Sequence, residues 1–87
     1  MIKESREKNR LLIADDSKMN REILKEILGD EYIVTEAKDG TEAIELLKKE
    51  EDSFSALLLD LNMPETNGYQ VLEWMNEEYV IERIPVI

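Results

Sequence analysis

The chain alternates between short apolar runs and longer stretches in which apolar residues recur with helical spacing. Residues 10–14 and 56–59 are almost continuously apolar, which is typical of strands that are buried on both faces of a sheet. Residues 32–37 are rich in β-forming side chains, and residues 84–87 begin a further apolar run. The pattern therefore predicts four strands.

Residues 17–28 have the features of an amphipathic helix. Ser17 is a good N-terminal cap, and Gly29 is a typical residue just after a helix C-terminus. The apolar residues between them recur at i, i+4 spacing and predict a stripe along the helix. We expect this stripe, and Trp74 further along the chain, to be packing residues and not a cofactor site; the stripe consists of Met19, Ile23, Leu24, Ile27 and Leu28.

Two further helices carry capping signals at their N-termini. Asp39 and Glu42 have the spacing of a capping box, in which a side-chain acceptor and a Glu or Gln three residues later satisfy each other's backbone amides. Asn67 and Gln70 have the same spacing. The helices that follow are predicted to end near residues 49 and 78.

The resulting order, βαβαβαβ, predicts an α/β fold with a parallel sheet and helices on both faces, because crossovers of this length are right-handed. A flavodoxin-like open sheet has the strand order 2-1-3-4-5, of which this chain would supply 2-1-3-4. Strands 10–14 and 56–59 would then flank the point where the strand order reverses, which is where such folds bind ligands. We expect residues 1–9 to be a polar leader and residues 10–87 to form one domain.

Composition narrows the classes of function. Eleven basic and 21 acidic residues give a net charge of −10, which argues against direct binding to nucleic acid or a membrane surface. Without cysteine or histidine, disulfides and thiolate or imidazole metal sites are excluded, so that only oxygen-ligated ions fit. The polar N-terminus is no signal peptide and no apolar stretch is long enough to span a membrane, so a cytoplasmic location is expected.

Three carboxylates directly follow two of the predicted strands. Asp15 and Asp16 follow the first strand, and Asp60 follows the third. Neighbouring parallel strands lie about 5 Å apart, so these side chains should crowd one crevice, where a divalent cation would relieve the repulsion between them. Each acid taken alone could simply cap a helix or end a strand. Their joint placement favours a Mg²⁺ site.

Asp60 is followed by the string Leu-Asn-Met-Pro-Glu-Thr-Asn-Gly, residues 61–68. Together with the earlier Asp15–Asp16 pair, this string resembles the receiver domain of two-component response regulators. The resemblance implies that Asp60 accepts a phosphoryl group from a sensor histidine kinase. It also implies that Asp16, Asp60 and the backbone carbonyl of Asn62 bind Mg²⁺ directly and that Asp15 acts mainly through water. Such a domain is a signalling module that at most catalyses its own phosphorylation.

The family has five βα units, and this chain ends inside the predicted fourth strand. The resemblance therefore implies that two phosphoryl-contacting residues are missing, a Ser or Thr after strand 4 and a Lys after strand 5. The helix that normally shares a face of the sheet with helix 17–28 is missing as well. We expect Leu and Ile side chains of strands 1 and 3 to reach solvent, and the chain to dimerise or exchange elements through strand 4 and the uncovered face.

Two other functions compete with a phosphoacceptor. The chain could be a phosphorylation-inert structural or dimerising fragment, because the residues that contact the phosphoryl group are missing. More remotely, it could be a metal-dependent phosphohydrolase that forms an aspartyl phosphate. That chemistry would place Asn62 where a second carboxylate is needed, and the chain is short for a substrate-covering domain.

Overall fold

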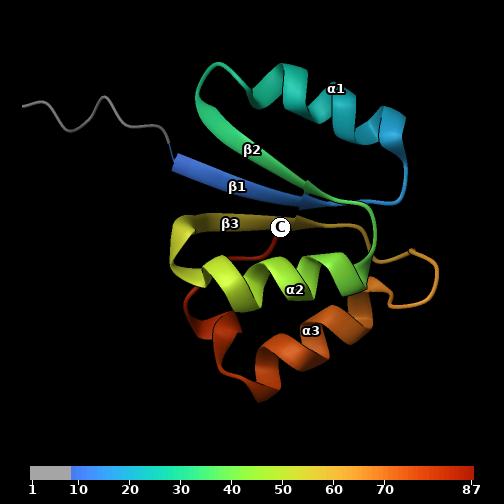
Figure 1. The fold of residues 1–87 in the computed structure, drawn as a ribbon, viewed down its shortest axis with the longest axis vertical. Helices are drawn as coiled ribbons and strands as arrows, with labels where there is room; N and C mark the ends of the chain where they lie inside the picture. Colours follow the sequence, from blue (N-terminus) through green and yellow to red (C-terminus); the bar gives the residue numbers. More distant parts are fainter. Residues whose placement is uncertain (1–8) are drawn as a thin grey trace, which may run out of the picture.

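The computed structural model describes residues 9–87, and of Glu51 only the backbone (Figure 1). The predicted leader, residues 1–9, lies outside the described residues except for Asn9, which begins the first strand. The strands are β1 (Asn9–Ala14), β2 (Tyr32–Ala37) and β3 (Phe54–Leu59). The helices are α1 (Lys18–Leu28), α2 (Gly40–Glu50) and α3 (Gly68–Glu77), with two short 3₁₀ turns, η2 (Glu51–Ser53) and η3 (Val80–Glu82).

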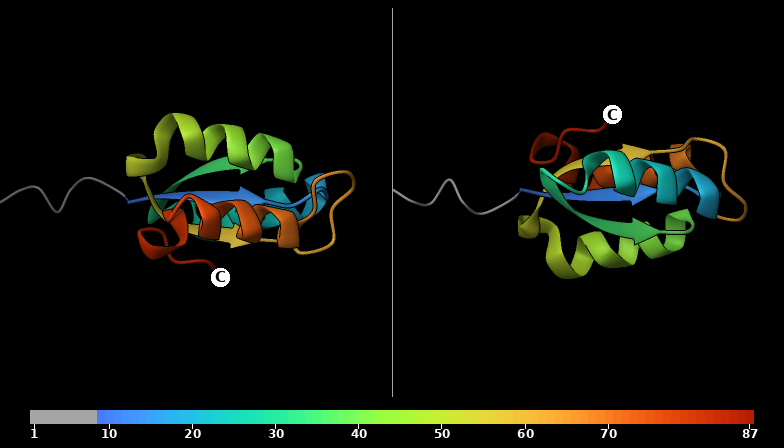
Figure 2. Two further views of the ribbon diagram at one scale, coloured as in Figure 1. Left: turned by 90° about the horizontal axis from the view of Figure 1, so that it is seen from below. Right: turned by 90° about the horizontal axis from the view of Figure 1, so that it is seen from above.

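The three strands form a parallel sheet in the order β2-β1-β3. The register aligns Ala14 with Ala37 on one side and with Leu59 on the other, so all three strands end at the same level. Helix α1 lies on one side of the sheet and α2 on the other (Figure 2). The predicted fold class, a flavodoxin-like parallel sheet with helices on both faces, is confirmed.

The predicted fourth strand is represented only by an isolated parallel bridge between Val86 and Leu57. The amide of Leu57 donates to the carbonyl of Pro85 (2.9 Å), and the amide of Ile87 donates to the carbonyl of Leu57 (2.8 Å). The segment thus lies beside β3 where a fourth strand is expected. Pro85 has no amide hydrogen to donate to a ladder, which limits the pairing here.

The main core lies between the sheet and the helices α2 and α3. Leu12 of β1 and Leu57 of β3 are fully buried there against Leu47 of α2 and Met75 of α3. Trp74 is partly buried against the same cluster, as predicted, and the Lys48 Nζ lies 6.0 Å from the centre of its ring. Because β1 and β3 contribute to this core, it fixes the strands whose ends carry the acidic residues.

The prediction that the whole apolar stripe of α1 packs in the core is wrong. No residue of α1 is buried. Leu24 and Leu28 are half-buried, whereas Met19 is 69% exposed, Ile23 50% and Ile27 68%. The i, i+4 pattern is wider than the part of the helix that the sheet covers, so the outer part of the stripe faces solvent.

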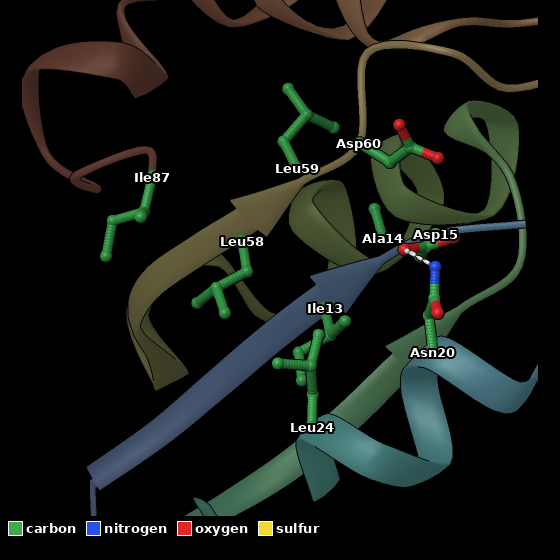
Figure 3. A pocket seen from close by; sticks show the side chains of 9 residues that line it. All are labelled: Ile13, Ala14, Asp15, Asn20, Leu24, Leu58, Leu59, Asp60 and Ile87. Atoms are coloured by element: carbon green, nitrogen blue, oxygen red, sulfur yellow. Dashed lines mark hydrogen bonds between the residues drawn. The ribbon is translucent and has the colours of Figure 1, made fainter. Parts of the chain in front are cut away.

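The face of the sheet beneath α1 is more buried than predicted. We expected Leu and Ile side chains of the first and third strands to reach solvent, but Leu11 and Ile13 are buried. Leu58 of β3 is half-buried on this face, while Leu59, which is also half-buried, packs against the core on the other face. Leu24 of α1 and Ile13 of β1 point toward one another in Figure 3, which explains why this part of the face is covered. The opening that remains is a pair of shallow depressions that share Leu58 and Ile87.

Candidate metal and phosphoryl site

Asp15 is held at the end of β1 by hydrogen bonds from several directions. Its amide donates to the carbonyl of Ala37 at the end of β2 (3.1 Å). Its Oδ1 accepts from the amide of Ser17 (2.9 Å), and its Oδ2 lies 3.5 Å from the side-chain amide nitrogen of Asn20 (Figure 3). The half-buried carboxylate therefore already has a donor on each oxygen.

Asp16 has a different environment, because it is exposed at the turn into α1. Within the described residues, no hydrogen bond engages its carboxylate. The next residue, Ser17, is the N-terminal cap of α1, as predicted, and its hydroxyl oxygen accepts from the amide of Asn20 (3.2 Å). Asp16 is thus fixed at its backbone by the end of a strand and the start of a helix, while its side chain stays free to bind a ligand.

Asp60 occupies the equivalent position at the end of β3. Its amide donates to the carbonyl of Ala14 (2.9 Å), which joins the ends of β3 and β1. Its Oδ1 accepts from the amide of Asn62 (3.0 Å), and its Oδ2 has no partner among the described residues. One oxygen of this half-buried carboxylate is therefore available for a ligand or for chemistry.

The structure brings the three predicted acids together. One carboxylate oxygen from each of Asp15, Asp16 and Asp60 lies within 4.8 Å of the others. Two oxygens bound to one Mg²⁺ lie at most about 4.2 Å apart, since each bond is about 2.1 Å long. The cluster thus fits a small divalent cation that binds two carboxylates directly and the third through water. A slight contraction of the spacing between the three oxygens would let all three carboxylates bind the ion directly.

The loop after Asp60 is tied to the start of α2. The amide of Gly40 donates to the carbonyl of Thr66 (3.0 Å), and the hydroxyl groups of Thr41 and Thr66 share a hydrogen bond of 2.8 Å. A Cβ on Gly40 would lie 2.2 Å from the Thr66 carbonyl oxygen, so only glycine permits this close approach. The sequence pattern had indicated none of these contacts.

The predicted capping box is confirmed at α3, whereas at α2 one of its two hydrogen bonds comes from the neighbouring residue. Asn67 and Gln70 form the expected reciprocal capping box at α3. At α2, Asp39 accepts from the amide of Glu42 (2.8 Å), but the Glu42 carboxylate accepts from Lys38 and not from Asp39. Both arrangements still satisfy amides at a helix start.

Comparison with known proteins identifies the family of the chain. Residues 11–87 match the response regulator receiver domain. The chain belongs to this family. The CheY homolog of Campylobacter jejuni, a chemotaxis protein, is 40% identical over 81 residues, which cover 90% of this chain and 61% of that protein. The chain therefore spans about three fifths of the length of this curated relative.

Solved receiver structures share the fold. Chemotaxis response regulator CheY4 of Vibrio cholerae has a TM-score of 0.82 at 27% identity, covering 92% of this chain and 66% of that one. Response regulator TrrA of Thermotoga maritima, solved in complex with Mg²⁺-BeF, has a TM-score of 0.74 at 31% identity, covering 80% of this chain and 60% of that one.

Enzymes also contain segments similar to this receiver. The 3',5'-cyclic-nucleotide phosphodiesterase regA of Dictyostelium discoideum is 36% identical over 81 residues, which are only 10% of its length. Most of that enzyme therefore lies outside the similar segment, and receiver domains themselves are generally signalling modules. None of the described helices of this receiver is long and apolar enough to cross a membrane.

An ion pair beside the receiver's acidic cluster links α1 to β2. The Arg21 Nε donates to a carboxylate oxygen of Glu36 (3.0 Å), and Lys25 approaches the second oxygen (3.4 Å). The hydrogen bond from Arg21, with a smaller contribution from Lys25, lowers the pKa of Glu36 below its usual value, against an opposing effect of burial. Sequence reasoning missed this pair, because nothing in the local pattern joins residues 15 positions apart.

We expect the Glu36 pair to make the folded receiver more sensitive to acid. Because the pKa of Glu36 is lower in the folded state, the stabilising effect of the ion pair is complete above the ordinary glutamate pKa of about 4.5 and is lost as the pH falls through the lower folded value. Glu36→Gln should therefore cost about 0.5–1 kcal/mol at pH 6.5 and much less at pH 3, as measured by urea unfolding.

The control for this pH experiment is Glu45→Gln, which changes an exposed glutamate of α2 that has no ion-pair partner in the described part of the chain. The effect of Glu45→Gln on the free energy of unfolding should be small at both pH values. A cost for Glu36→Gln that is the same at pH 6.5 and pH 3 would contradict the assignment.

Proposed function

We propose that this receiver accepts a phosphoryl group on Asp60, with Mg²⁺ bound beside it, from the phosphohistidine of a sensor kinase. The observation that carries the proposal is the acidic cluster at the ends of β1 and β3, with three carboxylate oxygens within 4.8 Å of one another. Family membership supports the same chemistry. The proposal makes the chain a cytoplasmic signalling module without direct nucleic-acid or membrane binding, in keeping with its net charge of −10.

The proposed Mg²⁺ ligands are the carboxylates of Asp16 and Asp60 and the backbone carbonyl of Asn62, with Asp15 acting through water. The hydrogen bonds support this division, because both oxygens of Asp15 already have donors, whereas the carboxylate of Asp16 has none among the described residues. When bound, the ion would neutralise the charge that develops during phosphoryl transfer. The Mg²⁺-BeF complex of the Thermotoga maritima relative is consistent with such a site.

Asp60 would supply the nucleophile through its free oxygen, Oδ2. This oxygen attacks the phosphorus, and the bond between phosphorus and the histidine nitrogen breaks. The bonding electrons stay on the imidazole nitrogen, which takes a proton from solvent. The amide of Asn62, already 3.0 Å from Oδ1, holds the carboxylate in one orientation during the attack.

The proposal is tested by intact-mass measurement after incubation with acetyl phosphate and Mg²⁺. We expect a gain of one phosphoryl group that is abolished by EDTA and by Asp60→Asn. A folded parent chain that shows no gain would favour the alternative of a phosphorylation-inert structural fragment. The phosphohydrolase alternative requires turnover of a phosphomonoester, and Asn62 supplies no carboxylate for it.

We propose that the kinase docks on the exposed outer part of the α1 stripe, which consists of Met19, Ile23 and Ile27. These three residues line a shallow depression together with Glu22 and Glu26. The stripe begins three residues after Asp16, so a partner seated on it would lie beside the acidic cluster. Exposed apolar patches of this kind commonly mark protein interfaces.

We expect Ile23→Glu to slow phosphoryl transfer from an autophosphorylated sensor kinase at least tenfold, while the rate with acetyl phosphate stays unchanged. A small donor does not need the stripe, whereas a protein donor would lose an apolar contact and meet a new charge. The matched control is Ile33→Glu, which makes the same change at a 49% exposed isoleucine of β2. Equal rates for Ile23→Glu and the parent with the kinase would reject this docking site.

We also propose that a second copy of the chain pairs with the edge at Val86 and covers the depressions beneath α1. Within the described residues, the amide and carbonyl of Val86 have no partner, and Ile87 is 77% exposed. An unpaired strand edge beside apolar side chains favours association between copies.

Light scattering at micromolar concentration should therefore show a dimer, more strongly at high salt because the net charge of −10 repels a second copy. Val86→Pro should shift the chain toward monomer, because proline removes the outward amide hydrogen, whereas Val86→Thr keeps it. A parent chain that stays monomeric under these conditions would reject the association.

A further inference from the structure

Arg21 connects three elements at the edge of the acidic cluster. Its side chain is 13% exposed, the least of the three basic side chains in the described ion pairs. One guanidinium nitrogen, Nη1, donates to the backbone carbonyl of Asp15 (2.6 Å), while Nε donates to Glu36 (3.0 Å). The arginine of α1 thus joins β2 to the peptide that follows β1.

The bond to the Asp15 carbonyl matters because of where that carbonyl lies in the chain. It belongs to the planar peptide group that joins Asp15 to Asp16. The amide of Asp15 is fixed by Ala37 (3.1 Å), and its carbonyl is fixed by Arg21, so the strand end is held on both sides of this residue. The orientation of the peptide in turn sets the direction in which the Asp16 side chain leaves the backbone.

We propose that Arg21 is a positioning residue for the Mg²⁺ site. It would place the carboxylate of Asp16 by holding the Asp15–Asp16 peptide, with Glu36 holding the guanidinium in place. Arg21 would touch neither the ion nor the phosphoryl group. This inference rests on the proposed Mg²⁺ site and assigns a role to a residue outside the acidic cluster.

Charge and geometry predict opposite outcomes when Arg21 is replaced. A nearby positive charge repels Mg²⁺, so its removal alone should tighten binding. Loss of positioning should weaken Mg²⁺ binding, since mutation of a residue that orients a metal ligand typically lowers metal affinity 10–100-fold. Lysine at this position keeps the charge but lacks the planar fork with which arginine reaches two acceptors.

The test is isothermal titration of Mg²⁺ into the parent chain and the variants Arg21→Lys, Arg21→Met and Lys25→Met. We expect about tenfold weaker binding in both Arg21 variants. Lys25→Met is the matched control, because it also removes a positive charge from Glu36 but breaks no contact with Asp15. Its affinity should stay within twofold of the parent or rise slightly.

Circular dichroism and urea unfolding identify which variants are folded at the titration temperature, and Arg21→Lys decides the question if Arg21→Met does not fold. If Arg21 had a purely structural role, its replacement would lower the free energy of unfolding without changing the Mg²⁺ affinity of the folded chain. Unchanged or tighter binding in folded Arg21 variants would overturn the positioning role alone. A parent chain that binds no Mg²⁺ would reject both this role and the proposed metal site.

Discussion

Asp60→Asn is expected to abolish phosphorylation by acetyl phosphate, whereas Asp16→Asn should slow it about 100-fold and Asp15→Asn about tenfold. The order follows from the hydrogen bonds around each group. Asp60 would be the nucleophile, and an amide oxygen cannot replace its carboxylate. Asp16 has a free, exposed carboxylate suited to direct coordination, while both oxygens of Asp15 have local donors. Initial rates of the mass gain at fixed Mg²⁺ measure all three effects.

The control for this series is Asp30→Asn, which makes the same change in charge at an exposed aspartate beyond the far end of α1. Its rate should equal that of the parent. If Asp15→Asn proved as damaging as Asp16→Asn, Asp15 would have to bind the ion directly. Phosphorylation of the Asp60→Asn variant at the parent's rate would identify a different acceptor and contradict the proposed chemistry.

Gly68→Ala is expected to cost about 3 kcal/mol of stability, which is a large part of the total for a domain of this size. A Cβ on Gly68 would lie 2.5 Å from the carbonyl oxygen of Asp60 and 2.6 Å from the Cα of Leu61. Both neighbours are backbone atoms, so they cannot move aside as a flexible side chain would. The added methyl group must push α3 away from the loop that carries the acidic residue.

Urea unfolding measures the cost at Gly68, with Glu73→Ala as the control for an alanine placed at an exposed position of the same helix. The control should stay within about 0.5 kcal/mol of the parent. Any Gly68→Ala protein that remains folded should also bind Mg²⁺ more weakly, since the clash is with Asp60 itself. A cost below 1 kcal/mol would mean that the loop adapts more easily than its backbone contacts indicate.

Local chemistry explains which features the sequence could predict. The caps at Ser17 and Asn67 depend on residues within three positions and were confirmed. The convergence of Asp15, Asp16 and Asp60 depends on topology, yet it was predictable because parallel strands end at the same edge of a sheet.

Features that depend on tertiary contacts could not be predicted in this way. The apolar spacing of α1 predicts a stripe, but it does not say which element covers it, so the exposure of Ile23 was missed. Arg21 reaches across from α1 to Glu36 and to a backbone carbonyl, and such contacts between elements leave no periodic signal. A basic residue on the first turns of a helix and an acid near the end of the adjacent strand are the only hints.

The ties between the loop after Asp60 and α2 have a consequence for how a chemical change at Asp60 could travel. Thr66 is bound to Gly40 through the backbone and to Thr41 through the hydroxyl groups. Movement of the loop would therefore either break both bonds or carry the first turn of α2 with it. That turn begins a helix whose Ala43 and Leu47 are fully buried, so the second outcome would shift the core. The Thr41–Thr66 pair thus joins the loop after the acidic site to the helical layer on the far side of the sheet from α1, and a displacement of this loop would reach that layer through it.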